Sequence, residues 1–307
     1  MSLPAPIDLQ KVIVQEDFSY GDHELQKLSV YHHFGKEESA QLAQRSGLWI
    51  IYIHGGAWRD PTITDQSIRF TLRTVYSRPS IRELLHNEVT AFASLSYRLS
   101  AHPDYPQKSG TPINILRKAK HPEHLEDVIK GISFLQEKYG FGSKYMLIGH
   151  SCGATLAFQS IIRTQLSIPA SIPFTNPQVV VGVAGIYDLK LLRDKNPYPA
   201  YHEFLAQAFG VDEKVWDLAS PAKHDLAEVW PEVKTVIVVS SSKDEMIDPT
   251  QIECMRKSLG SLREKATVKV LQDFLDQSHD HIWDDGEGLA KVIVESLMAW
   301  LSDGSFA

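Results

Sequence analysis

One five-residue segment has the pattern of a serine nucleophile. Ser151 lies between Gly149 and Gly153 in the motif GHSCG, after an apolar run at 145–149 and before a helical pattern at 154–164. A sharp turn from a strand into a helix exposes the central hydroxyl, and the flanking glycines let neighbouring backbone approach closely. We therefore predict that Ser151 attacks an acyl carbon. Because Ser151 is the centre of the pattern, Cys152 is expected to contribute its amide rather than its thiol.

A second motif, HGGAW at 54–58, follows the apolar run at 48–53. Acyl transfer passes through an oxyanion that needs preorganised N–H donors, and a Gly-Gly turn can direct successive amides into one cavity. We predict that the amides of Gly56 and Ala57, together with that of Cys152, form this oxyanion hole; the alternative is a plain Gly-rich β-turn. His54 and Gly55 are expected to shape the turn. The sequence leaves open whether Trp58 lines the pocket or packs in the core.

A serine nucleophile needs a base and a residue that orients it, and in one large fold class the chain order is Ser, acid, His. Asp244 follows the apolar run at 235–240 and is the predicted acid, with Glu245 as the second candidate. Asp248 precedes Pro249 and is better explained as a helix N-cap. After the run at 268–271 the sequence has His279, the predicted base, and His281, the alternative.

Composition limits the partners that the protein is expected to have. The chain has 307 residues, a net charge of −7 and two cysteines, Cys152 and Cys254. The charge disfavours nucleic acid or an anionic membrane as the main partner. We recognise no export signal, membrane span, HExxH motif or Cys/His metal spacing, and we expect no metal or cofactor.

Short apolar runs alternate with helical patterns, which indicates an α/β fold with a mostly parallel central sheet and helices on both faces. We predict strands at 48–53, 90–97, 145–149, 179–184, 235–240 and 268–271, and helices at 122–139 and about 287–301. No flexible linker interrupts them, so residues 1–307 are interpreted as a single domain. Two Pro-rich segments, 100–121 and 167–178, are predicted to be long loops. Tyr97 and Arg98 in YRLS, and Asp127, are expected to be structural.

In this order HGGAW, YRLS, GHSCG, SSKDE and SHDH resemble the esterase and lipase branch of the α/β-hydrolases, over about residues 30–301. The HGGxW form and the run GIYDL at 185–189 look like kynurenine formamidase. The resemblance implies a cytosolic, commonly homodimeric enzyme with a Ser151-Asp244-His279 triad and an oxyanion hole at Gly56 and Ala57.

Such an enzyme hydrolyses N-formyl-L-kynurenine to L-kynurenine and formate in tryptophan breakdown, which feeds de novo NAD synthesis, and it uses no metal. Trp58 and Tyr187 are candidates for contacting the leaving group. A general carboxylesterase is the alternative function, and a non-catalytic binding module of the same fold is a minor one.

Overall fold

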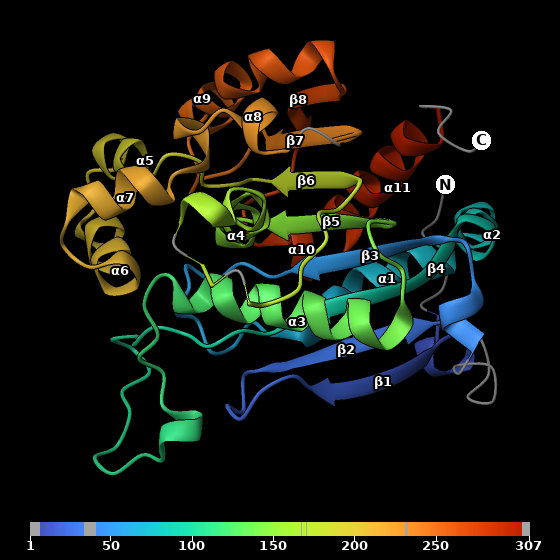
Figure 1. The fold of residues 1–307 in the computed structure, drawn as a ribbon, viewed down its shortest axis with the longest axis horizontal. Coiled ribbons are helices and arrows are strands. Elements are labelled where there is room, and N and C mark those ends of the chain that lie inside the picture. The colour runs from blue at the N-terminus through green and yellow to red at the C-terminus, as the bar shows by residue number, and fades with distance from the viewer. Residues whose placement is uncertain (1–6, 34–40, 167, 170, 231–232, 303–307) are drawn as a thin grey trace.

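A computed structural model describes residues 7–33, 41–166, 168–169, 171–230 and 233–302. Within these residues the strands form one sheet in the order β1-β2-β4-β3-β5-β6-β7-β8 (Figure 1). Strand β2 pairs antiparallel with β1 and β4, and the other neighbours pair parallel. The strands are β1 (Val14–Ser19), β2 (Lys27–His32), β3 (Leu48–Ile53), β4 (Val89–Leu95), β5 (Tyr145–His150), β6 (Val179–Val183), β7 (Thr235–Ser241) and β8 (Thr267–Leu275).

Helices cover both faces of the sheet. In Figure 1, α3 and α4 lie in front of it, and α1 and α11 lie behind it. The helices are α1 (Ile68–Ser77), α2 (Pro79–Glu88), α3 (Glu123–Tyr139), α4 (Cys152–Ile161), α5 (Leu189–Lys195), α6 (Pro199–Phe209), α7 (Glu213–Ala219), α8 (Leu226–Val229), α9 (Thr250–Ser258), α10 (His281–Asp284) and α11 (Glu287–Ser302). This arrangement confirms the predicted α/β-hydrolase fold.

The alternation of side chains along β5 explains why the central strands read as continuous apolar runs. Tyr145 and Leu147 belong to the core beneath α3 and α4, whereas Met146 and Ile148 belong to the core beneath α1 and α11. Successive side chains of a strand point to opposite faces, so a strand covered on both sides needs apolar residues at every position.

The predicted strands are all present, with small differences at their ends: β4 ends at Leu95, and β8 extends to Leu275. Helix α3 starts just after Pro122, which is its N-cap, and α4 starts at Cys152. The hairpin of β1 and β2 was not predicted. Strand β1 is an edge strand with several half-buried polar side chains, so it lacks the apolar run that marks a central strand.

The predicted loop at 100–121 contains only a short 3-10 helix, Ile113–Ile115, and extends away from the sheet at the lower left of Figure 1. Both ends are tied to the body: the Ser100 amide donates to the Trp58 carbonyl at 2.9 Å, and the Ala119 amide donates to the Leu99 carbonyl at 3.0 Å. In the second predicted loop, Ser167 and Ala170 lie outside the described residues, and the described positions contain no helix or strand.

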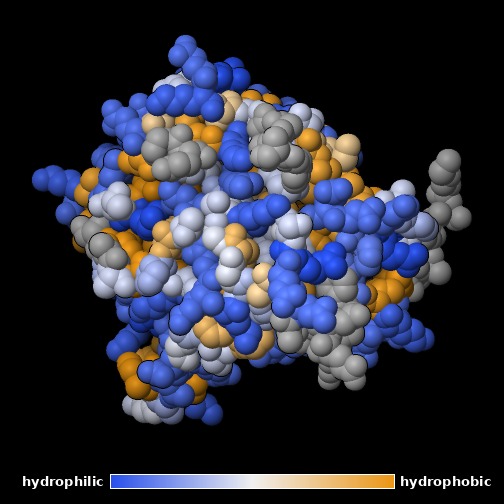
Figure 2. Space-filling view, turned by 45° about the vertical axis from the view of Figure 1, so that its right-hand side comes forward, coloured by the Kyte–Doolittle hydropathy of each residue, from blue (hydrophilic) through white to orange (hydrophobic). Residues whose placement is uncertain are grey.

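The surface in Figure 2 carries mainly hydrophilic side chains, with hydrophobic ones in separate groups. In the described part of the chain, no helix combines the length and apolarity needed to cross a bilayer. The parallel strands β5 and β6 point toward α5, α6 and α7 at the left of Figure 1. Functional side chains of such sheets gather at the carboxyl ends of the strands, so this edge is where the predicted site should lie.

Candidate active site

Ser151 occupies the tight turn between β5 and α4. Its φ of 55° and ψ of −125° are outside the regions that a non-glycine residue ordinarily adopts, and its amide donates to the Val183 carbonyl of β6 at 2.9 Å. A Cβ at Gly149 would lie 2.1 Å from the Gly153 carbonyl oxygen, and one at Gly153 would lie 2.3 Å from the Ile53 carbonyl oxygen. Backbone contacts therefore require both flanking glycines.

The HGGAW turn runs through three successive residues with positive φ: 98° at Gly56, 48° at Ala57 and 59° at Trp58. The Trp58 amide donates to Cys152 Sγ at 3.3 Å, and the Arg59 amide donates to the Gly56 carbonyl at 2.9 Å. In the described part of the chain, no carbonyl accepts from the amides of Ala57 or Cys152. Gly56 and Ala57 line the same cavity as Ser151, so this turn can present amides to an oxyanion there.

The Tyr97 side chain packs against the HGGAW turn and forms hydrogen bonds with it. Its hydroxyl donates to the carbonyls of His54 at 3.1 Å and Gly55 at 3.3 Å, and its ring stacks on the His54 imidazole with centroids 4.6 Å apart. Burial lowers the pKa of His54, whose Nδ1 contacts the Gly55 carbonyl at 2.8 Å. A Cβ at Gly55 would lie 3.0 Å from the Ser151 Cβ. His54 and Gly55 thus hold the turn close to the serine.

Asp244 follows β7, His279 follows β8, and the structure brings the two side chains together. His279 Nδ1 lies 2.9 Å from Asp244 Oδ2, and both side chains are only 3% exposed. Asp244 Oδ1 accepts from the amides of Met246 and Ile247, both at 2.9 Å. Two backbone donors on one oxygen leave the other oxygen to face the imidazole, so the loop after β7 fixes the orientation of His279.

The alternative acids and base lie elsewhere. Glu245 accepts from the His279 amide at 3.0 Å, so it contacts the backbone of His279 and not its ring. Asp248 accepts from the Thr250 amide at 2.9 Å at the start of α9, which matches its expected capping role. The side chain of His281 is 66% exposed and pairs with Asp284 at 2.8 Å, and this carboxylate raises its pKa.

A second buried imidazole packs against His279. The His150 and His279 ring centroids are 4.6 Å apart. Burial, followed by the neighbouring His279, holds the pKa of His150 well below its usual range. His150 is the second residue of GHSCG, and from the sequence it was expected to be only a surface or core residue. His150 is thus a buried neighbour of the His279 ring that comes from the GHSCG motif itself.

A cavity of about 230 Å³ opens over Ser151 and His279. Helix α6 contributes the aromatic residues Tyr201 and Phe204 to its wall. Ala200 of α6 also lines it. The other lining residues come from the turn after β3, the start of the 100–121 loop and the loops after β6, β7 and β8: Gly56, Ala57, Arg59, Asp60, Ile63, His102, Ile186, Met246, Ile247 and Asp280.

Neither predicted leaving-group contact belongs to this cavity. Trp58 is fully buried and its ring meets Phe209 edge-on with centroids 4.9 Å apart, which resolves the open alternative in favour of the core. Tyr187 is also buried, against Phe158. Sequence reasoning missed the residues of α6. The pair Pro199 and Gly210, at the first helical position and just past the end, was the available signal for that helix.

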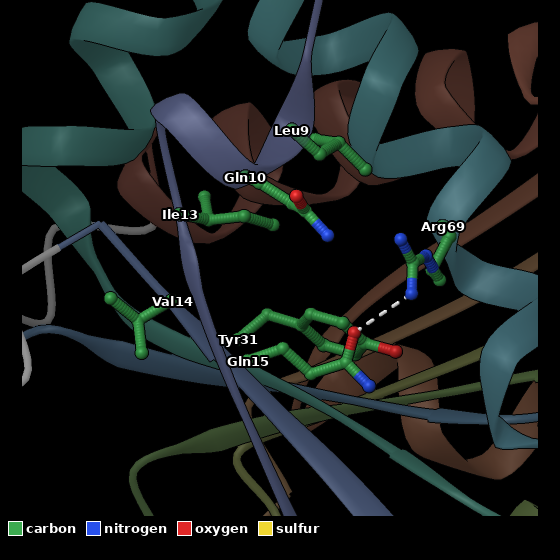
Figure 3. A pocket seen from close by; sticks show the side chains of 7 residues that line it. All are labelled: Leu9, Gln10, Ile13, Val14, Gln15, Tyr31 and Arg69. Carbon is green, nitrogen blue, oxygen red and sulfur yellow. Dashed lines mark hydrogen bonds between the residues drawn. The ribbon is translucent and has the colours of Figure 1, made fainter.

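A separate cavity of about 340 Å³ lies between the N-terminal segment, β2 and α1 (Figure 3). Arg69 Nη1 donates to Gln15 Oε1 at 3.0 Å across it. Its remaining lining residues are Leu9, Gln10, Ile13, Val14 and Tyr31. It shares no residue with the cavity over Ser151. Among the described residues, no cluster of three or more His, Cys, Asp or Glu has the geometry to hold a metal.

The chain has sequence relatives among known hydrolases. No family model matches the chain. The chain is 41% identical to the kynurenine formamidase-like hydrolase fscH of Fusarium equiseti, over 82% of this chain and 83% of that protein. It is 33% identical to the kynurenine formamidase avaC of Aspergillus versicolor, over 78% and 85%. Identity to the kynurenine formamidase of Meyerozyma guilliermondii is 31%, over 77% of each.

Solved structures show the same fold. Esterase B from Lactobacillus rhamnosis superposes with a TM-score of 0.64 at 16% identity, over 95% of this chain and 86% of that one. An esterase/lipase from an uncultured bacterium gives 0.61 at 16% identity, over 97% and 87%. The fold is therefore that of the α/β-hydrolase esterases, and the sequence relatives are more specific: the chain belongs to the kynurenine formamidase family.

Proposed function

We propose that the protein is an arylformamidase that hydrolyses N-formyl-L-kynurenine to L-kynurenine and formate. The observation that carries the proposal is the buried His279–Asp244 pair, which faces the same cavity as Ser151 and the HGGAW turn. The names of two relatives that are 31% and 33% identical supply the substrate. A serine hydrolase site in a chain of this family fits that reaction.

In the proposed mechanism, His279 accepts the proton of Ser151 as the hydroxyl attacks the formyl carbon. The Asp244 carboxylate accepts a hydrogen bond from Nδ1–H of His279, so Nε2 is the nitrogen that can accept the proton. The amides of Gly56, Ala57 and Cys152 stabilise the oxyanion; losing one such donor typically costs about 2.7 to 4 kcal/mol of transition-state stabilisation. Protonated His279 then gives its proton to the departing aniline nitrogen. Water, activated by the same imidazole, releases formate from the formyl-serine.

The cavity also fits the asymmetry of this substrate. A formyl carbon carries only hydrogen besides its oxygen and nitrogen, so the acyl side needs little room. The amine side must accept an aromatic ring that carries an amino acid. Tyr201 and Phe204 of α6 provide an aromatic wall for such a ring.

The substrate assignment is tested with a panel of amides and esters. Purified protein should release L-kynurenine from N-formyl-L-kynurenine with a higher kcat/KM than it shows for short 4-nitrophenyl esters. Ester turnover without formamide cleavage would identify the general carboxylesterase instead. A folded sample that cleaves neither class, and whose Ser151 is not labelled by a fluorophosphonate probe, would identify a binding module.

The family resemblance extends the proposal to tryptophan breakdown and de novo NAD synthesis, to a cytosolic location and to a homodimer. Residues 1–307 would form a single domain, and the mechanism above uses no metal or cofactor. Size-exclusion chromatography with light scattering tests the dimer, and cell fractionation tests the location.

A further inference from the structure

The HGGAW turn at 54–58, which is predicted to form the oxyanion hole, places Arg59 at the candidate site. Arg59 directly follows HGGAW, its amide donates to the Gly56 carbonyl at 2.9 Å, and its side chain is only 11% exposed. It lines the cavity together with Ser151 and His279. The Arg59 side chain therefore starts from the turn that carries the predicted oxyanion donors.

In the part of the chain that the structure describes, one end of this guanidinium is hydrogen-bonded and the other is not. Nη1 donates to Glu203 Oε1 and to Gln207 Oε1, both at 2.9 Å, and the charged carbon lies 5.7 Å from the Phe204 ring centroid. Among the described residues, Nε and Nη2 have no acceptor. An arginine has five N–H donors in a rigid plane. The edge formed by Nε and Nη2 matches the two oxygens of a carboxylate.

The charges around the cavity are arranged in both signs. Arg59 is the only Lys or Arg among its described lining residues. Asp60 and Asp280 are the carboxylates that line it, and Asp244 lies behind His279. Asp280 is exposed, and among the described residues its Oδ1 accepts only from Trp283 Nε1, at 3.4 Å. A zwitterion in this cavity can therefore meet a cation and an anion that both line it.

We infer that Arg59 binds the α-carboxylate of an amino acid on the leaving-group side of the substrate, through Nε and Nη2, while Asp280 faces the α-ammonium group. This inference rests on the proposed function and deepens it: the enzyme selects formanilides that carry an amino-acid side chain over neutral formanilides. Glu203 and Gln207 accept only from Nη1, so the edge formed by Nε and Nη2 is left for the ligand.

The test compares two formanilides that share the reacting group. N-formyl-L-kynurenine carries the amino acid, and 2-formamidoacetophenone keeps the ring, the ortho ketone and the formamide without it. Arg59→Gln should lower kcat/KM for N-formyl-L-kynurenine by about 10- to 100-fold, the range expected for lost hydrogen bonds to a charged group. The same variant should change kcat/KM for 2-formamidoacetophenone by about twofold at most, because that substrate never meets the guanidinium. Arg59→Lys should recover only part of the loss, since an ammonium lacks the planar pair of donors.

Glu203→Gln is the matched control, because it breaks the same ion pair and leaves Arg59 in place. The preference for N-formyl-L-kynurenine should survive this change. Equal losses on both substrates in Arg59→Gln, reproduced by Glu203→Gln, would overturn the inference and show that Arg59 only fastens α6 to the turn. A wild-type enzyme that cleaves both formanilides equally well would also overturn it, with the formamidase function intact. Cleavage of neither formanilide would refute the proposed function, and this inference with it.

Discussion

Replacing Asp244 by Asn tests whether the loop after β7 sets the tautomer of His279. In the structure Oδ1 of Asp244 accepts from two amides, and Oδ2 faces His279 Nδ1 at 2.9 Å. An asparagine keeps the first interaction only if its oxygen takes the Oδ1 position. Its NH₂ group then points at Nδ1, which must become an acceptor, and the ring proton moves to Nε2. The nitrogen that should receive the Ser151 proton is then already occupied.

The expected loss in kcat is about 10⁴-fold, the effect of this change in a well-studied Ser-His-Asp triad, which corresponds to about 5.4 kcal/mol in the activation barrier. Release of L-kynurenine from N-formyl-L-kynurenine, followed by its absorbance, measures it. Thermal unfolding should show that Asp244→Asn is folded. Two controls lie on the same loop: Glu245→Gln and Asp248→Asn should each stay within about tenfold of wild type, because neither carboxylate faces the imidazole. Near-wild-type turnover in Asp244→Asn, or a 10⁴-fold loss in Glu245→Gln, would refute the assignment.

Three further predictions concern the surroundings of the site. Tyr97→Phe removes the hydroxyl donor beneath the oxyanion turn and should lower the free energy of unfolding by about 1 to 3 kcal/mol, seen as a lower Tm and a reduced kcat; an unchanged Tm and kcat would contradict that support. Burial raises the pKa of Cys152 to about 11, so iodoacetamide at pH 8 should leave both this thiol and the activity intact; inactivation with Cys152 alkylated would show the thiol to be accessible. Burial lowers the pKa of His121 to about 4 and of His124 to about 3, below about 6.5 in the unfolded chain. The unfolded chain therefore binds more protons between these values, so the free energy of unfolding should fall as the pH drops below about 6.5; His124→Gln should flatten this fall in pH-dependent melts, and an identical slope would count against it.

The central sheet was predictable because burial on both faces makes each inner strand a continuous apolar run. The same reasoning failed for β1, where half-buried polar side chains at a sheet edge give no such run. The three candidate catalytic residues could be named because each follows a strand, and parallel strands deliver the residues after their carboxyl ends to one edge. Their roles stay predictions until they are tested by substitution.

The walls of the cavity could not be predicted in the same way. Tyr201 and Phe204 reach it only because α6 packs across the edge of the sheet, and no local pattern in the sequence records that packing. The sequence does not show that Trp58 packs in the core, because its partner Phe209 lies about 150 residues further along the chain. Arg59 directly follows a recognised motif, yet the sequence does not show that its guanidinium contacts α6, more than a hundred residues further along the chain. Local sequence patterns therefore predict the catalytic candidates, whereas the residues that form the cavity wall depend on tertiary packing.

The most direct test of the account is the rate of L-kynurenine release by wild type and by Ser151→Ala, measured on N-formyl-L-kynurenine. We predict efficient release by the wild type and a loss on the order of 10⁴-fold or more in the variant, because removing the nucleophile of a triad leaves only the oxyanion hole and binding. Comparable release by Ser151→Ala, or no release by a wild-type protein that is folded and hydrolyses esters, would contradict it.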